Sequence, residues 1–145
     1  MKRAIILLLL VFIVMALSSC SKEIEVESYY FQPSVSVIEG TLITRLHYGP
    51  PNFGEDPEND EHQYPFIILL DKPINVLTED SDEVNSDTYD VSEVQLALRG
   101  EPYVEMAKQY KDKQIKVQGT LFSAFTGHHH TKVLMFVDEI LEDID

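Results

Sequence analysis

The chain of 145 residues is poor in cysteine, basic side chains, glycine and proline. Its single cysteine excludes a disulfide within the chain, so the fold must be held by burial alone. Six glycines and seven prolines, beside 44% hydrophobic residues, exclude collagen-like and wholly disordered classes. Only 11 basic residues face 25 acidic ones, and the net charge of −14 argues against a nucleic-acid partner. The length suits one domain.

The longest hydrophobic run is too short to span a membrane. It covers the 14 residues Ala4–Leu17, after Lys2 and Arg3, whereas a spanning helix needs about 20. This arrangement predicts a signal peptide over residues 1–19. The adjoining Leu17-Ser18-Ser19-Cys20 resembles a bacterial lipobox, which implies lipid on Cys20. We therefore expect the protein in the cell envelope, outside the cytoplasm, with the membrane as its partner through that lipid.

Two segments follow the predicted cleavage site. Residues 20–32 are polar and acidic, and we expect a flexible tether there. We expect Tyr29, Tyr30 and Phe31 to dock this tether onto the domain, with an exposed contact as the alternative. Residues 33–145 form the predicted domain, in which alternating apolar residues or short apolar runs indicate strands. Five strands are predicted, over residues 35–46, 64–70, 92–98, 114–124 and 132–140. For the second strand, an extension over residues 74–77 after a bend is an alternative. Loops rich in proline or carboxylates are expected over 47–63 and 78–90.

One short helix is predicted between the third and fourth strands. Tyr103, Met106, Ala107 and Tyr110 recur at the spacing of one helix face, and Pro102 suits a first helical turn. Three strands, a helix and two strands are the element order of an OB-like five-stranded barrel, so the fold class is mainly β. A small α+β sheet covered by one helix is the alternative.

The most unusual segment is Thr126–Thr131, with three consecutive histidines between the last two strands. On an extended backbone His128 and His130 share one face and His129 takes the other. Three interpretations stay open: a zinc or copper site on His128 and His130, hydrogen-bonded loop packing, and a ligand-contacting or pH-sensing patch. A metal needs a further ligand, for which His47, His62 or a loop carboxylate is available.

Sequence signals for catalysis are lacking. The only cysteine is the predicted lipidation site, and neither a nucleophile elbow nor a phosphate-cradling glycine loop is found. The acidic loops do not match a calcium-binding loop either, because Val84 occupies the third ligand position after Asp80 and Asp82. We expect a non-enzymatic protein; a hydrolase is a weaker hypothesis.

Several motifs carry a family resemblance. They are Glu39–Leu42, Tyr48–Asn52, Leu70–Ile74, Val117–Phe122, and Thr126–Thr131 with the following Val133-Leu134. Together they resemble an uncharacterised bacterial exported family, the domain of unknown function numbered 4431, over most of residues 36–140. The resemblance implies an exported OB-like domain without established activity, and it supplies no catalytic residues.

We therefore predict a single-domain envelope lipoprotein that acts as a binding or interaction module for an unknown protein or small molecule. The candidate contact residues are His128, His129, His130, Tyr48 and Asn52. The alternative function is metal binding, with zinc or copper held by His128 and His130. No other cofactor is expected.

Overall fold

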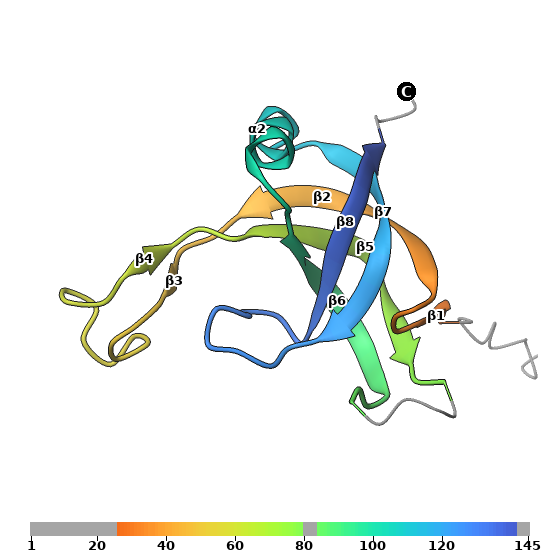
Figure 1. Ribbon diagram of the computed structural model, residues 1–145, viewed down its shortest axis with the longest axis horizontal. Helices are drawn as coiled ribbons and strands as arrows, with labels where there is room; N and C mark the ends of the chain where they lie inside the picture. The colour runs from red at the N-terminus through yellow and green to blue at the C-terminus, as the bar shows by residue number, and fades with distance from the viewer. Residues whose placement is uncertain (1–25, 80–83, 142–145) are drawn as a thin grey trace, which may run out of the picture.

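The computed structural model describes residues 26–79 and 84–141 (Figure 1). The predicted signal peptide, the predicted lipidation site Cys20 and the first part of the predicted tether lie outside these residues. Within them, no helix combines the length and the hydrophobicity needed to cross a bilayer.

The described chain is built almost entirely from strands. The elements in chain order are β1 (Ser28–Tyr30), β2 (Val35–Thr44), β3 (His47–Tyr48), β4 (His62–Gln63), β5 (Phe66–Leu77), β6 (Thr88–Ala97), α2 (Glu101–Gln109), β7 (Gln114–Ser123) and β8 (Val133–Leu141).

Five of the strands close into a ring. β5 pairs antiparallel with β2 on one side and with β6 on the other. β7 pairs antiparallel with both β2 and β8, and the parallel pairing of β6 with β8 completes the circuit. The predicted mainly β class is thus confirmed, and α2 is the one helix among the described residues, between the third and fourth strands of the ring.

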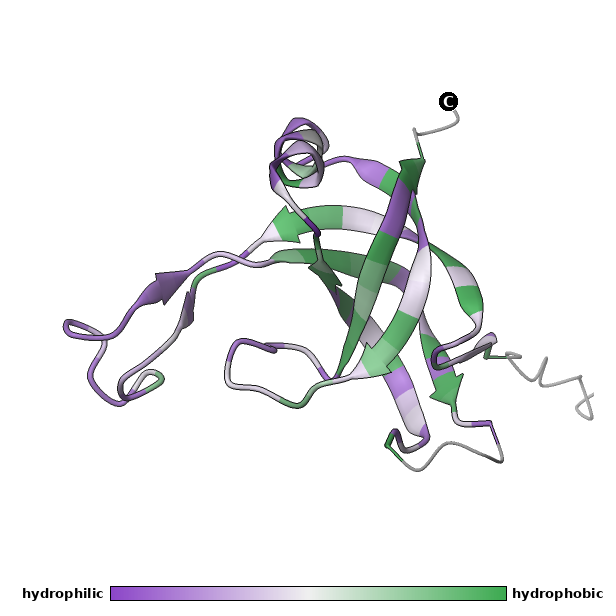
Figure 2. Cartoon of the chain, viewed as in Figure 1, coloured by the Kyte–Doolittle hydropathy of each residue, from purple (hydrophilic) through white to green (hydrophobic). Residues whose placement is uncertain are grey.

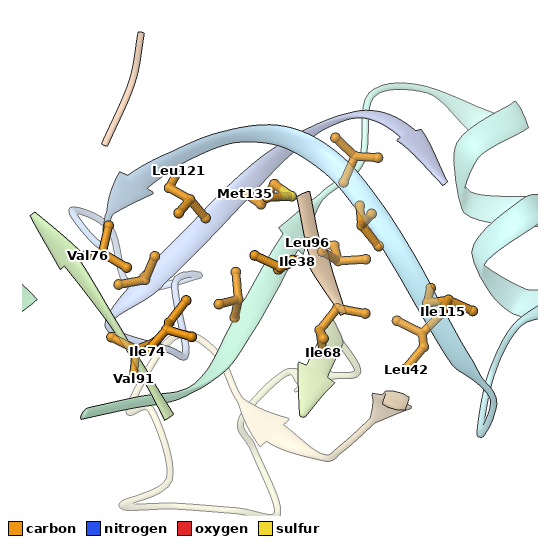
Figure 3. Close-up of a cluster of buried hydrophobic side chains, with 14 of the residues drawn as sticks. Ile38, Leu42, Ile68, Ile74, Val76, Val91, Leu96, Ile115, Leu121 and Met135 are labelled. Carbon is orange, nitrogen blue, oxygen red and sulfur yellow. The ribbon is translucent and has the colours of Figure 1, made fainter. Parts of the chain in front are cut away.

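The interior of the ring is apolar because alternate residues of each strand point inward. In β2, for example, Ile38 and Leu42 are buried while their neighbours are more exposed. Figure 3 shows these side chains meeting Ile68, Leu121 and Met135 from the other strands. Green apolar segments recur on all five ring strands in Figure 2. Gly40 lets β2 cross close to β5, since a Cβ there would overlap the Leu69 carbonyl oxygen.

The helix α2 packs against the core through its apolar face, as predicted. Pro102 lies in the first turn, where a missing N–H costs least. Ala107 is fully buried, and Tyr103 and Tyr110 pack against the core. The Tyr103 hydroxyl also donates to the Asp138 carbonyl at 3.1 Å, which ties α2 to β8.

The ordered domain begins before the predicted boundary at residue 33. β1 pairs parallel with the end of β5, from Ser28 opposite Asn75 to Tyr30 opposite Leu77. Phe31 follows with 1% of its surface exposed and forms a bridge to Leu121. The expected docking of this aromatic segment onto the domain is therefore found, although the acidic composition of the stretch gave no sign of a strand.

β5 continues through Pro73 to Leu77, so the expected extension of the second strand over residues 74–77 is confirmed; its pairing with β6 shifts register between Leu69 and Ile74. Two other features of the predicted loops differ from expectation. β6 begins at Thr88, inside the predicted acidic loop, and Asp90 has a φ of 55° there. The predicted loop over 47–63 contains the β3–β4 hairpin, whose two-residue strands are too short for a periodic signal.

Candidate functional site

Two connections of the ring lie together on its outer face. They are residues 45–65, which contain the β3–β4 hairpin, and residues 124–132, which contain the three histidines; we call the pair the loop layer. Gly127 approaches the ring of Phe53 so closely that a Cβ would lie 2.7 Å from Phe53 Cε1. The layer therefore brings together the two segments predicted as the contact region.

The loop layer covers outward-facing residues of the ring. Gln95 points out of the ring between Val94 and Leu96, which face the core, and yet only 9% of its surface is exposed. Ile67 on β5 and Leu134 on β8 are its pairing neighbours, and both are buried. The loops thus have a small apolar cluster of their own to rest on.

Gln95 fixes the backbone of the histidine segment. Its amide nitrogen donates to the His128 carbonyl at 3.0 Å, and its amide oxygen accepts from the His130 N–H at 2.7 Å. The Gln95 N–H donates to Thr131 Oγ1 at 3.0 Å, and that hydroxyl donates to the Val133 carbonyl. The predicted hydrogen-bonded loop packing is found in these contacts.

Gln63 joins the hairpin to the imidazoles. Its amide oxygen lies 2.8 Å from His130 Nε2, and its amide nitrogen lies 2.8 Å from His128 Nδ1. Glu61 Oε2 accepts from the same nitrogen at 3.1 Å, which sets the orientation of the amide. With that orientation His130 Nε2 donates to the amide oxygen of Gln63, and His128 Nδ1 accepts from its amide nitrogen. His128 and His130 therefore do share one partner on one face.

A row of contacting side chains leads from His130 through His47 and Arg45 to Glu93 on β6. The imidazoles of His47 and His130 stack with their centroids 4.3 Å apart. Arg45 Nε lies 3.5 Å from His47 Nε2, and the Arg45 guanidinium pairs with Glu93 at 2.7 Å. Burial lowers the pKa of His47 and also that of His130, and the charge of Arg45 lowers the pKa of His47 further. Both rings are consequently neutral near pH 7.

His129 points to a different neighbourhood. Its Nδ1 accepts from the Phe125 N–H at 3.1 Å, and its ring packs edge-on against Phe125 and Phe122. Burial lowers the pKa of His129, and the neighbouring His128 adds to the effect. The opposed directions expected for His129 and its two neighbours are thus found.

Tyr48 and Asn52 take structural positions in the hairpin. The Tyr48 ring packs edge-on against His62, at 5.4 Å between centroids. The Asn52 N–H donates to the Asp60 carboxylate at 2.7 Å, as does the Gly54 N–H. Burial alone would raise the pKa of Asp60, but the donated hydrogen bonds outweigh it and the pKa is lowered. Asp60 is therefore an internal anchor of a loop whose composition suggests only solvated carboxylates.

Sequence reasoning missed two further kinds of residue. Gln63 and Gln95 carry no signal of their own, because glutamine is common on surfaces and only the fold shows what it bridges. Phe53 and Phe125 stand on the loop layer with 54% and 74% of their surfaces exposed. Large exposed aromatic rings on loops are a feature of contact surfaces, and their place in polar loop segments was the available clue.

The described residues do not assemble a set of ligands at the predicted metal site. Across residues 26–79 and 84–141, no three His, Cys, Asp or Glu side chains gather as ligands for one ion. His130 Nε2 and His128 Nδ1 already share Gln63, and His62 packs against Tyr48 instead of joining them. Metal binding at His128 and His130 stays a prediction.

Comparison with known proteins gives one match. No curated protein and no solved structure matches the chain. Residues 93–141, from β6 to the end of β8, match the family model described as "Domain of unknown function (DUF4431)". This span is narrower than the residues 36–140 over which the motifs indicated a resemblance, but it includes α2 and the histidine segment. The domain-of-unknown-function family predicted from the sequence is thereby confirmed for residues 93–141 of this chain.

Proposed function

We propose that this chain is a lipid-anchored envelope protein whose ring of strands is an OB-type barrel that binds an uncharged oligosaccharide on the loop layer. The observation that carries the proposal is the shared contact of Gln63 with His128 and His130, because it unites the two predicted contact segments. The function is binding, without catalysis.

The strand order supports the OB-type barrel. With β2, β5, β6, β7 and β8 numbered one to five, the circuit runs one, two, three, five, four, with its parallel pair between three and five. The helix falls between the third and fourth strands, as in that architecture. In OB-type domains the second and third strands, with the loops after the first and fourth, hold oligonucleotides or oligosaccharides. The loop layer consists of those two loops.

The charge of the loop layer disfavours an anionic ligand, because residues 55–61 of the hairpin carry several carboxylates, whereas the groups around the histidines suit a neutral one. The net charge of −14 opposes an oligonucleotide. Arg45 and Glu93 neutralise each other, and the lowered pKa values of His47 and His130 leave their rings uncharged near pH 7. Exposed Phe53 and Phe125 offer apolar faces for sugar rings, beside imidazole and amide groups that donate and accept hydrogen bonds.

The leader sequence supports the anchor. With Lys2 and Arg3 removed, the mature chain has 9 basic residues (11 − 2) against the same 25 acidic ones. Such a body is repelled by anionic lipid, so stable attachment needs acyl chains at Cys20. Mass spectrometry of the membrane fraction tests this part: the peptide that begins at Cys20 should carry lipid, and Cys20→Ala should release or misprocess the protein.

Binding is tested by NMR titration of the isotopically labelled protein with chitohexaose and maltohexaose, and with single-stranded DNA for comparison. Oligosaccharide should shift the resonances of the histidine segment, and the DNA should not. Phe53→Ala and Phe125→Ala should weaken binding about tenfold each, as expected for lost ring contacts. Tyr89→Ala, at an exposed ring on the far part of β6, is the matched control. Shifts confined to other surfaces, or none with either sugar, would overturn the ligand class.

A further inference from the structure

A groove lies away from the loop layer, between β2, the middle of β5 and the segment that leads into β1. Its volume is about 850 Å³. Its lining combines apolar side chains, among them Val37, Leu70 and Ile74, with charged groups on the rim. The proposed function makes no use of it.

The groove opens where β2 parts from β5. β2 pairs with β5 from Gly40 onward, whereas its first residues, from Val35 to Glu39, pair only with β7. Leu42 exchanges backbone hydrogen bonds with the β7 side, through Lys113 and Asp112. Because neighbouring residues of an antiparallel strand direct their backbone groups to opposite sides, the N–H and C=O groups of Val35, Val37 and Glu39 point toward the β5 side. Val37 and Glu39 line the groove. This edge of β2 has no strand partner within the described chain.

A second free edge bounds the groove on the side of β1. The Asn75 N–H donates to the Glu27 carbonyl at 2.9 Å, and the Phe31 N–H donates to the Leu77 carbonyl at 3.0 Å. In a parallel pair the residues between those that bond face away, so the backbone groups of Ser28 and Tyr30 point away from β5. β1 and β2 thus present two edges that no described strand joins (Figure 1).

Side chains of the groove are arranged in two rows. Ile38 and Ile74 lie on the core side and are buried, while Val37 is 41% exposed on the outer side. The Tyr29 hydroxyl is hydrogen-bonded to Glu27, and burial with that carboxylate raises the pKa of Tyr29 to about 12. A strand laid in the groove would direct alternate side chains to an apolar floor and to the rim.

The rim carries more negative than positive charge. Four carboxylates line the groove, from Glu27, Glu39, Asp71 and Asp90, against the two ammonium groups of Lys72 and Lys116. Lys116 is already paired with Glu39 at 3.1 Å. Asp90 lies at the irregular pairing of β5 with β6 and has a φ of 55°, and such irregularities re-aim side chains. An occupant that complements this rim is cationic.

From these edges, floor and charges we infer that the groove is a peptide-binding site, which takes an extended segment of alternating apolar and basic residues as an added strand on β2. Backbone pairing with Val35, Val37 and Glu39 gives the affinity, and the carboxylates select lysine or arginine at the rim positions. The site is independent of oligosaccharide binding on the loop layer.

The test is isothermal titration of the full-length protein in detergent with a short, end-blocked peptide of alternating lysine and valine. Saturable binding is expected, and it should weaken as salt rises. The same peptide with alternate amides N-methylated, so that its pairing edge lacks N–H donors, should bind about tenfold more weakly or not at all. A peptide with glutamate in place of lysine should not bind.

Two variants locate the binding. Val37→Pro removes an N–H that β7 does not use, so the ring should persist, as circular dichroism checks, while peptide binding is lost. Asp90→Asn keeps a residue that tolerates a positive φ and should weaken binding two- to fivefold, about the effect of one partly exposed charge pair. Glu58→Gln removes a carboxylate outside the groove and should change nothing.

Three outcomes would overturn the site. They are no binding of the lysine peptide, equal binding of its N-methylated form, and equal effects of Asp90→Asn and Glu58→Gln. The last two would reduce the interaction to general attraction by an acidic surface. If Val37→Pro does not fold, the N-methylated peptide and the Asp90→Asn comparison decide the matter without it.

Discussion

The interior of the ring and the loop layer on its outer face are held together by different forces. The interior is apolar, and fully buried side chains such as Phe31, Leu42 and Met135 stabilise it by removal from water. The loop layer rests on a small apolar cluster and is held by polar contacts, in which Gln63 and Gln95 bind the histidine segment. The interior should therefore be insensitive to pH, and substitutions in it should cost much stability, whereas the loop layer should respond to pH and lose less stability on substitution.

The largest effect is expected in the interior, from Phe31→Ala. The ring of Phe31 is 1% exposed and packs into the core cluster, so its removal leaves a cavity. Loss of a buried phenylalanine side chain costs about 3–5 kcal/mol of unfolding free energy. Urea denaturation followed by circular dichroism measures the change.

The matched control for Phe31→Ala is Tyr30→Ala, since Tyr30 precedes Phe31 and is 45% exposed. We expect this neighbour to cost about 1 kcal/mol or less. Equal effects of the two substitutions would contradict the assignment of Phe31, and with it β1, to the core of the domain.

A smaller loss is expected in the loop layer, from Gln95→Leu. Leucine leaves the His128 carbonyl and the His130 N–H without the amide that binds them, at a cost of about 1–3 kcal/mol. Hydrogen exchange at the His130 amide should accelerate while the amides of β7 change little. Gln118→Leu, on β7 away from the loop layer, is the control, and unchanged exchange at His130 would refute the bridging role of Gln95.

Acid is expected to loosen the loop layer before the interior. The pKa values of His47, His129 and His130 are lowered from 6.5, chiefly by burial. These histidines therefore bind protons at a higher pH in the unfolded chain than in the folded one. The free energy of unfolding falls as the pH drops below 6.5, and it goes on falling until the lower pKa values of the folded state are reached. The carboxylates of Asp60 and Asp87, with pKa values lowered from 3.8, lose their contribution only in stronger acid.

The measurement is the unfolding free energy from pH 8 to pH 5, with NMR titration of the imidazoles. A glutamine at positions 47 and 130 cannot gain the charge, so the double variant His47→Gln, His130→Gln should flatten the slope in this window. An unchanged slope in that variant would place the pH dependence elsewhere.

The interior was largely predictable from the sequence, and the loop layer was predictable only as a location. Alternation in residues 35–46 or 114–124 needs no distant partner to be recognised, because burial on one face imposes it. Gln63, in contrast, gains its meaning from His128, which lies 65 positions away, and no local pattern announces such a contact. The same holds for the two strand edges that bound the groove, whereas the aromatic residues from Tyr29 to Phe31 did indicate that the tether docks onto the domain.

The smallest effect is expected at the boundary of the two regions, from Glu93→Gln. Glu93 lies on the outer face of β6 and pairs with Arg45 at 2.7 Å, but both side chains are partly exposed to water. Exposed ion pairs contribute about 0–1 kcal/mol, so the free energy of unfolding should hardly change. A double-mutant cycle with Arg45→Gln isolates the pair. Arg45 also lies against His47, and without the carboxylate its charge is no longer offset, so the pKa of His47 should fall further. The imidazole titration is therefore the more sensitive measurement. A rise in the pKa of His47 would show that the Arg45–Glu93 pair does not connect β6 to the histidines.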